Sequence, residues 1–247
     1  MIKWTSFKKF EEFLSNTESW IAGIDFPFGQ SRKFIKNIGW PKTWRGYVNY
    51  VSSMNRSEFR EALDKYKELR PFGDKEHLRL TDFAASSLSP QKQYGVPIGL
   101  MFFEGAPRLL KSGATLPGLL NGDPKRLIVE AYPGVLAKRL IGRRSYKQDD
   151  QKKQTADQTN ARHDILMKIM NGDCYEDYGF SVEASHDICA DPTGDQLDSL
   201  LCAIQATWAW NNRENKYGAP FNADPLEGWI ADPITCERMN KIFNGVE

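Results

Sequence analysis

The chain reads Arg126-Leu127-Ile128-Val129-Glu130-Ala131-Tyr132 immediately before Pro133. A short apolar run that stops at a proline predicts a buried β-strand. The run from Trp20 to Phe26 is of the same kind, because it stops at Pro27 and Gly29, and it predicts a second buried strand. These two strands are the part of the sequence that decides the fold class.

Apolar residues at helical spacing surround both strands. They predict helices over Thr5–Leu14, Asn55–Leu69 and Gly134–Ile141, through Ala161–Ile169, and over roughly residues 195–210. Because strands and helices interleave along the chain, we expect an α/β layer architecture in a single domain, residues 1–247. Residues 71–125 are rich in Gly and Pro and predict a loop-rich insertion.

Composition excludes several classes of protein. Charged residues make up 26% and apolar residues 40% of the chain, which is ordinary for a globular protein. The net charge of +1 gives no general electrostatic reason to bind nucleic acid or a membrane. No apolar run approaches the roughly 20 residues that cross a bilayer. The start lacks the features of a signal peptide, and the four cysteines form no CxxC pair, so we expect a cytoplasmic location.

The most informative acidic residues are Asp195 and Asp198. They are three residues apart on a predicted helix, so both carboxylates point the same way beside the apolar residues Leu197 and Leu201. Two like charges so close to a core are costly unless a cation lies between them. A divalent metal ion is the simplest candidate for that cation.

Two further acids stand in apolar strands. Asp25 ends the first strand, and Glu130 lies inside the second, where a carboxylate needs a partner. With Asp195 and Asp198 they form a set of hard oxygen ligands suited to Mg²⁺ or Mn²⁺. Two such ions about 4 Å apart can activate a water molecule for phosphodiester hydrolysis.

Each acid also has a structural interpretation. Asp25 before a proline is a common turn residue, Glu130 could pair with a buried Arg, and Asp195 could be the favourable charge at a helix N-terminus. Asp198 is harder to explain in this way. The combination of the four favours the metal site.

Other signals are weaker. Basic residues over 138–153 could contact phosphates, but a solvated helix face with Asp149 and Asp150 interspersed is the better explanation of them. Aromatic residues over 40–50 could stack on bases or pack in the core. There is no GxGxxG, Walker or GxSxG motif, so nothing supports a dinucleotide-binding protein, a P-loop ATPase or a serine hydrolase.

Three segments together resemble the motif series of the DUF429 family, a family of predicted nucleases with a ribonuclease H-like fold. They are Gly23-Ile24-Asp25-Phe26-Pro27-Phe28-Gly29, Val129-Glu130-Ala131-Tyr132-Pro133 and the stretch from Asp195 to Ala203. Three weaker likenesses lie between or after them: Arg79-Leu80-Thr81-Asp82, Lys152-Lys153 followed by Arg162, and Glu227-Gly228-Trp229-Ile230 through Pro233. The likeness runs in the correct order from about residue 20 to residue 233.

The resemblance implies a ribonuclease H-like mixed sheet flanked by helices. It also implies a catalytic metal site for Mg²⁺ or Mn²⁺ at Asp25, Glu130, Asp195 and Asp198, with Arg79, Lys153 and Arg162 on the substrate phosphate. One departure stands out, because ribonuclease H-like folds begin with a strand that supplies the first acid, whereas this chain begins with a predicted helix. Either the chain starts downstream of the natural beginning or the sheet is incomplete.

The leading hypothesis is a metal-dependent nuclease that hydrolyses phosphodiester bonds of nucleic acid. One alternative is a catalytically degenerate module of the same fold that binds nucleic acid or a protein. A second alternative is a metal-dependent hydrolase of a small phosphorylated metabolite. DNA, RNA and every oligomeric state are compatible with the sequence.

Overall fold

A small parallel sheet lies at the centre of the computed structural model, which describes residues 2–245. Strands β1 (Trp20–Ile24), β2 (Ala114–Thr115) and β3 (Asp123–Glu130) are arranged in the order β1-β3-β2, and both strand pairs are parallel. A single parallel bridge joins Glu130 to Ile230 at the carboxyl end of β3. The α/β class expected from the sequence is confirmed.

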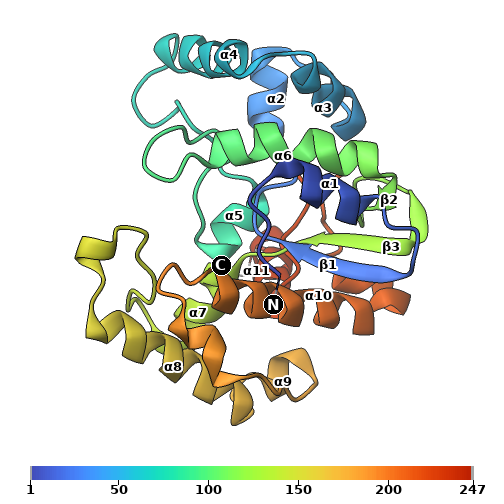
Figure 1. Ribbon diagram of the computed structural model, residues 1–247. Helices are drawn as coiled ribbons and strands as arrows, with labels where there is room; N and C mark the ends of the chain where they lie inside the picture. Colours follow the sequence, from blue (N-terminus) through green and yellow to red (C-terminus); the bar gives the residue numbers. More distant parts are fainter. Residues whose placement is uncertain (1, 246–247) are drawn as a thin grey trace.

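Helices cover both faces of the sheet (Figure 1). Between β1 and β2 the chain forms α2 (Arg32–Ile38), α3 (Trp44–Ser52), α4 (Arg56–Glu68), α5 (Leu80–Ala85) and α6 (Ile98–Ser112), and α1 (Phe7–Leu14) precedes β1. After β3 it forms α7 (Pro133–Ile141), α8 (Ala156–Met170), α9 (Tyr175–Tyr178), α10 (Asp195–Asn211) and α11 (Pro233–Phe243). Three 3₁₀ turns complete the fold: η1 (Gln151–Lys153), η2 (His186–Ala190) and η3 (Arg213–Gly218).

The alternation of side chains along β3 divides the hydrophobic core in two. Leu127 and Val129 are buried with residues of α7, α8 and α10, whereas Ile128 is buried with residues of α2, α3, α4 and α6. Successive side chains of a strand point to opposite faces, so an apolar run with no polar alternation is what a strand covered on both faces requires.

Gly23 permits an unusually close approach of β1 to α10. A Cβ atom at this position would lie 2.4 Å from the backbone carbonyl oxygen of Cys202, a distance that no side chain tolerates. Asp25 follows Gly23 by two residues, and Asp198 lies one helical turn before Cys202. The close contact therefore brings these two carboxylates to the same end of the sheet.

The structure differs from the sequence-based expectation in two places. A mixed sheet was expected, but all paired strands within residues 2–245 are parallel. Five helices separate β1 from β3, which is the long connection that a parallel pair needs, whereas β2 and β3 are joined by residues 116–122 alone and pair with an irregular register. The supposedly loop-rich segment 71–125 contains the 15-residue helix α6. Gly105 of this helix packs directly against the Phe26 ring, because a Cβ atom at position 105 would lie 2.3 Å from that ring. Pro107 also lies inside the helix.

The other predicted helices are confirmed. Asn55 caps α4 in a capping box with Glu58. The helix that carries Asp195 and Asp198 runs from Asp195 to Asn211. No helix within residues 2–245 is long and apolar enough to cross a membrane.

Candidate functional site

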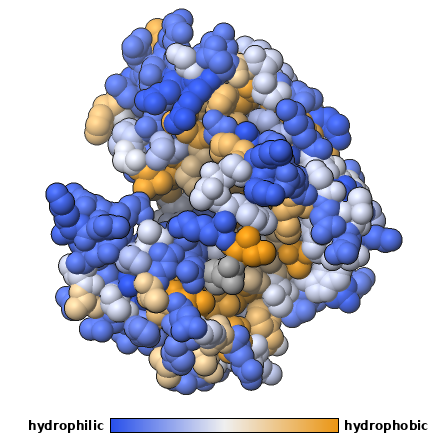
Figure 2. Space-filling view, viewed as in Figure 1, coloured by the Kyte–Doolittle hydropathy of each residue, from blue (hydrophilic) through white to orange (hydrophobic). Residues whose placement is uncertain are grey.

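A cleft lies at the carboxyl ends of β1 and β3. It has a volume of about 220 Å³, and its polar lining includes Asp25, Tyr132, Lys147 and the Arg79–Asp82 pair. The surface is visibly hollowed on the left of the molecule, between the lobe that contains η1 and the part of the fold above it (Figure 2). The crevice outside the carboxyl ends of parallel strands is where α/β proteins generally bind ligands.

Asp25 is the unusual residue of this cleft. Its half-buried side chain forms no hydrogen bond or ion pair with any residue within 2–245. Burial, which is the largest cause, and the neighbouring charge of Asp198 together raise the pKa of Asp25 from 3.8 to about 6, and the Lys147 ammonium opposes this rise. A carboxyl group in such a position is poised to gain a proton or a cation.

Asp198 already has two partners. The Tyr146 hydroxyl donates to one carboxylate oxygen at 2.6 Å, and the Lys147 ammonium donates to the other at 2.5 Å. The Lys147 side chain is 46% exposed and lines the cleft, whereas that of Asp198 is 13% exposed and touches the cleft only through Lys147. The cation that the sequence required beside Asp198 is therefore Lys147 in this structure.

Two other residues hold Tyr146 and Lys147 in place. Gly194, at φ +78°, has the Lys147 Cβ only 2.8 Å from where its own Cβ would be, so this position requires glycine. Buried Arg162 donates to the backbone carbonyls of Tyr146 at 2.9 Å and Cys189 at 2.8 Å. Because its guanidinium is committed to protein oxygens, we assign Arg162 a positioning role in place of the expected contact with phosphate.

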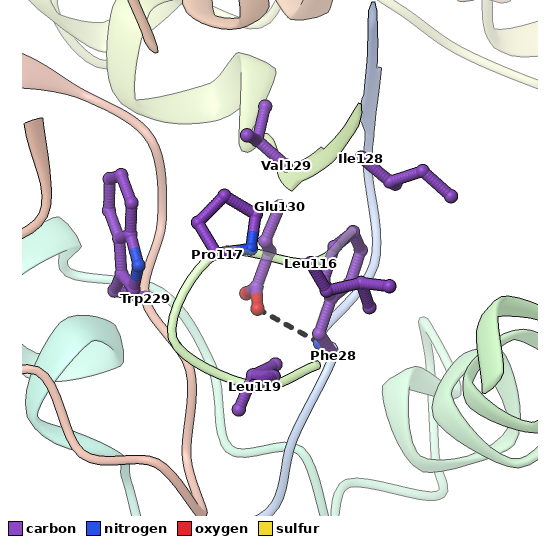
Figure 3. Close-up of a pocket in the computed structure, with 8 residues that line it drawn as sticks. All are labelled: Phe28, Leu116, Pro117, Leu119, Ile128, Val129, Glu130 and Trp229. Atoms are coloured by element: carbon purple, nitrogen blue, oxygen red, sulfur yellow. Dashed lines mark hydrogen bonds between the residues drawn. The ribbon is translucent and has the colours of Figure 1, made fainter. Parts of the chain in front are cut away.

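Glu130 is the carboxylate of a buried ion pair. The Arg79 guanidinium donates to its two oxygens at 2.8 and 2.5 Å, and the Phe28 amide donates at 2.9 Å. Figure 3 shows the Glu130 carboxylate directed at the Phe28 amide among apolar side chains, including Trp229. Burial raises the pKa of Glu130 and Arg79 opposes that rise, so the pairing suggested as the structural alternative is present.

The Arg79 guanidinium also binds residues of two other segments. It is 1% exposed and binds Asp82 through two hydrogen bonds of 2.9 and 2.8 Å as well as the Glu227 carbonyl at 3.0 Å. The Glu227 carboxylate accepts from the backbone amides of Arg32 and Leu80. These segments, which carry three of the motifs that resemble the DUF429 series, are joined by one buried polar network, and Arg79 has little freedom to bind a phosphate.

Asp195 and Lys153 lie outside the cleft. The Asp195 side chain is 62% exposed and pairs with Lys3 at 3.3 Å, and Lys153 is 71% exposed and pairs with Asp150 at 3.3 Å. The first turn of α10 thus directs Asp198 toward the cleft and leaves Asp195 at the surface. A charge at this position favours the helix N-terminus, which is the simpler explanation of Asp195.

The structure does not gather the four predicted carboxylates at one place. Within residues 2–245 no group of three or more His, Cys, Asp or Glu side chains is placed to hold a metal ion. Both oxygens of Glu130 accept from the buried Arg79 guanidinium, whereas the oxygens of Asp198 accept from the Tyr146 hydroxyl and from the partly exposed Lys147 ammonium. Asp25 and Asp198 remain as a pair of carboxylates on adjacent elements. Mg²⁺ is commonly held by one or two protein carboxylates together with waters and substrate phosphate.

Sequence reasoning missed Tyr132, Tyr146 and Lys147. Tyr132 lines the cleft beside Asp25, and its backbone is clamped by Gln205, whose side-chain oxygen accepts from the Tyr132 amide at 2.8 Å. Lys147 belongs to the basic stretch for which a solvated helix face was the preferred explanation. Its pairing with Asp198, 51 residues away, has no local sequence signal.

Comparison with protein-family models, with curated proteins and with solved structures finds no match for this chain. The identification of the site therefore depends on the geometry of its own residues. The likeness to the DUF429 motif series stays a prediction from the sequence.

Proposed function

We propose that the cleft is the active site of a phosphodiesterase that uses one divalent cation, Mg²⁺ or Mn²⁺, held by Asp25 and Asp198. The observation that carries this proposal is the unpartnered Asp25 carboxylate beside Asp198 at the carboxyl ends of parallel strands. Burial and a like charge make the ionised form of Asp25 costly, and a cation removes both causes. The carboxylates select a hard cation over a soft one.

The charge of the site supports an anionic substrate only when the cation is bound. Asp25, Asp198 and Lys147 together carry one net negative charge at neutral pH when Asp25 is ionised. A divalent cation changes this to one net positive charge, which complements a phosphodiester. A bound cation of this kind lowers the pKa of a water molecule and neutralises charge on the phosphoryl group.

Lys147 has two roles in this proposal. Without the cation its ammonium neutralises Asp198. If a cation were bound to Asp198, the Lys147 ammonium would be free to contact the substrate phosphate, for which its long flexible side chain and partial exposure suit it. Tyr146 keeps its hydrogen bond to Asp198 and fixes the orientation of that carboxylate.

The resemblance to DUF429 favours nucleic acid as the source of the phosphodiester and a ribonuclease H-like origin of the fold. A parallel sheet with an acid at the end of β1 and a second acid on the helix packed against that strand supports this origin. The cytoplasmic location expected from the sequence agrees with a nuclease that acts on cellular nucleic acid.

A second candidate is a binding module of the same fold without turnover. The observation that favours it is that Lys147 and Arg79 already neutralise Asp198 and Glu130 in the protein itself. Such a module would bind its ligand without any dependence on divalent metal.

The test is hydrolysis of bis(p-nitrophenyl) phosphate and of a labelled single-stranded oligonucleotide in Mn²⁺. We expect hydrolysis by the wild type, loss in Asp25→Asn and Asp198→Asn, and retention in Asp195→Asn. The last variant is the matched control, because it makes the same change three residues away on the same helix, outside the cleft. Hydrolysis without metal, or equal loss in both α10 variants, would refute the proposal. Salt-sensitive binding of the oligonucleotide without cleavage would favour the binding module.

A further inference from the structure

The cleft has an apolar side in addition to its charged one. Leu88, Val96, Ile98 and Met101 line it, and all four come from residues 88–101, the loop after α5 and the start of α6. Leu88 is 49% and Val96 59% exposed, so they face open space. With Phe26 we call these residues the apolar wall. Exposed apolar side chains gathered at a cleft are typical of ligand-binding sites.

Phe26 gives the apolar wall a fixed aromatic ring. Its ring lies against Gly105 of α6, so closely that a Cβ at Gly105 would be 2.3 Å from it. The ring also packs against Phe28, with 5.3 Å between the ring centroids. Phe26 follows Asp25 directly in the chain, so the ring and the proposed cation site are adjacent. A ring held in this way can stack with a planar group without losing much conformational freedom.

We propose that the apolar wall is a base-binding subsite and that the cleft takes one nucleotide unit, with the base on the wall and the phosphate near Asp25 and Lys147. The inference rests on the proposed function for the phosphate end of the ligand only. The separation of an apolar lining from an adjoining charged lining matches the two ends of a nucleotide. Ser87, the polar residue next to the wall, already donates to Asp82, so we expect little discrimination between bases.

The size of the cleft sets the length of the ligand. Sites for drug-sized ligands occupy about 300–1,000 Å³. A cleft of about 220 Å³ lies below that range, so the part of a ligand that it encloses is no larger than one nucleotide unit. The unit can come from a free mononucleotide or from the end of a single strand, because both present the same base and phosphate.

The test is the affinity for adenosine 5′-monophosphate (AMP) and ribose 5-phosphate, measured by isothermal titration calorimetry in Mg²⁺ and in EDTA. We expect AMP to bind about tenfold more tightly than ribose 5-phosphate in Mg²⁺, because a base held between the Phe26 ring and the side chains of Leu88 and Val96 gains affinity of that magnitude. The double variant Leu88→Ser, Val96→Ser should remove most of this difference and leave the affinity for ribose 5-phosphate unchanged. Leu69→Ser is the control, since Leu69 is 87% exposed and does not line the cleft.

Equal affinities for the two ligands, an equal loss for both in the double variant, or no binding of AMP would overturn the inference. Its failure is distinguishable from that of the proposed function. Metal-dependent hydrolysis without a preference for AMP refutes the base subsite alone, and a preference for AMP that persists in EDTA without any hydrolysis refutes the phosphodiesterase alone. The affinity for a single-stranded oligonucleotide with a 5′-phosphorylated adenosine shows where the nucleotide unit comes from. Tighter binding of this oligonucleotide than of AMP identifies the end of a strand as the ligand, and equal or weaker binding identifies a free mononucleotide.

Discussion

Replacing Asp25 by Asn should make the protein more stable at neutral pH. The pKa of the Asp25 carboxyl rises from 3.8 to about 6 on folding, chiefly because of burial. A rise of this size corresponds to about 3 kcal/mol that the ionised carboxylate costs the folded state. Asparagine has the same shape and no charge, so Asp25→Asn avoids the cost.

The sign of the effect follows from which state ionises first. Well below pH 4 the carboxyl is protonated in the folded and the unfolded chain and contributes nothing. As the pH rises, the unfolded chain ionises first because its pKa is lower, and the folded state loses stability until the pH passes about 6. Above that pH the loss is constant at about 3 kcal/mol.

The assay is urea unfolding of the wild type and Asp25→Asn at two pH values in EDTA. We expect the variant to be more stable by about 1 kcal/mol at about pH 4.5 and by about 3 kcal/mol at about pH 8. Asp195→Asn is the control, because it makes the same chemical change at an exposed site outside the cleft. A variant less stable than the wild type at about pH 8, or a gap that does not change with pH, would refute the reasoning.

Three further substitutions test the packing around the site by urea unfolding. Glu130→Ala leaves the buried Arg79 guanidinium without one of its two carboxylate partners, and we expect a loss of about 3–5 kcal/mol; an unchanged midpoint would contradict the buried pair. Gly105→Ala places a Cβ 2.3 Å from the Phe26 ring and should cost about 1–3 kcal/mol, whereas a neutral result would show that the ring is not held there. Gly23→Ala forces β1 away from α10, because the new Cβ would meet a backbone carbonyl oxygen of α10 at 2.4 Å. We expect this variant to lose both stability and affinity for Mn²⁺. No effect on either property would contradict the close contact.

The features that depend on residues close together in the chain could be predicted from the sequence. The two strands, the capping box at Asn55 and the helix beginning at Asp195 were all predictable, because apolar spacing and capping residues act within a few positions. The closeness of Asp25 and Asp198 was suggested by their places at a strand end and a helix start.

The rest depended on contacts between distant segments. Arg79 and Glu130 are 51 residues apart in the chain. The sequence therefore allowed an ion pair between Glu130 and some buried Arg, but it could not show that Arg79 is the partner. Lys147 reaches Asp198 only because the loop before η1 is held by Arg162 and packs on Gly194. The glycines and proline of α6 suggested a loop, although one of those glycines is required by the neighbouring Phe26 ring. In each case tertiary packing decided what local propensity could not.

The most direct test of the central claim is a calorimetric titration of Mn²⁺ into four proteins: wild type, Asp25→Asn, Asp198→Asn and Asp195→Asn. If Asp25 and Asp198 together hold one divalent cation, the wild type and Asp195→Asn bind one Mn²⁺ per chain with similar affinity, and the other two variants lose it. The claim would be contradicted if Asp25→Asn and Asp198→Asn bound Mn²⁺ as tightly as the wild type does, or if the wild type bound no Mn²⁺.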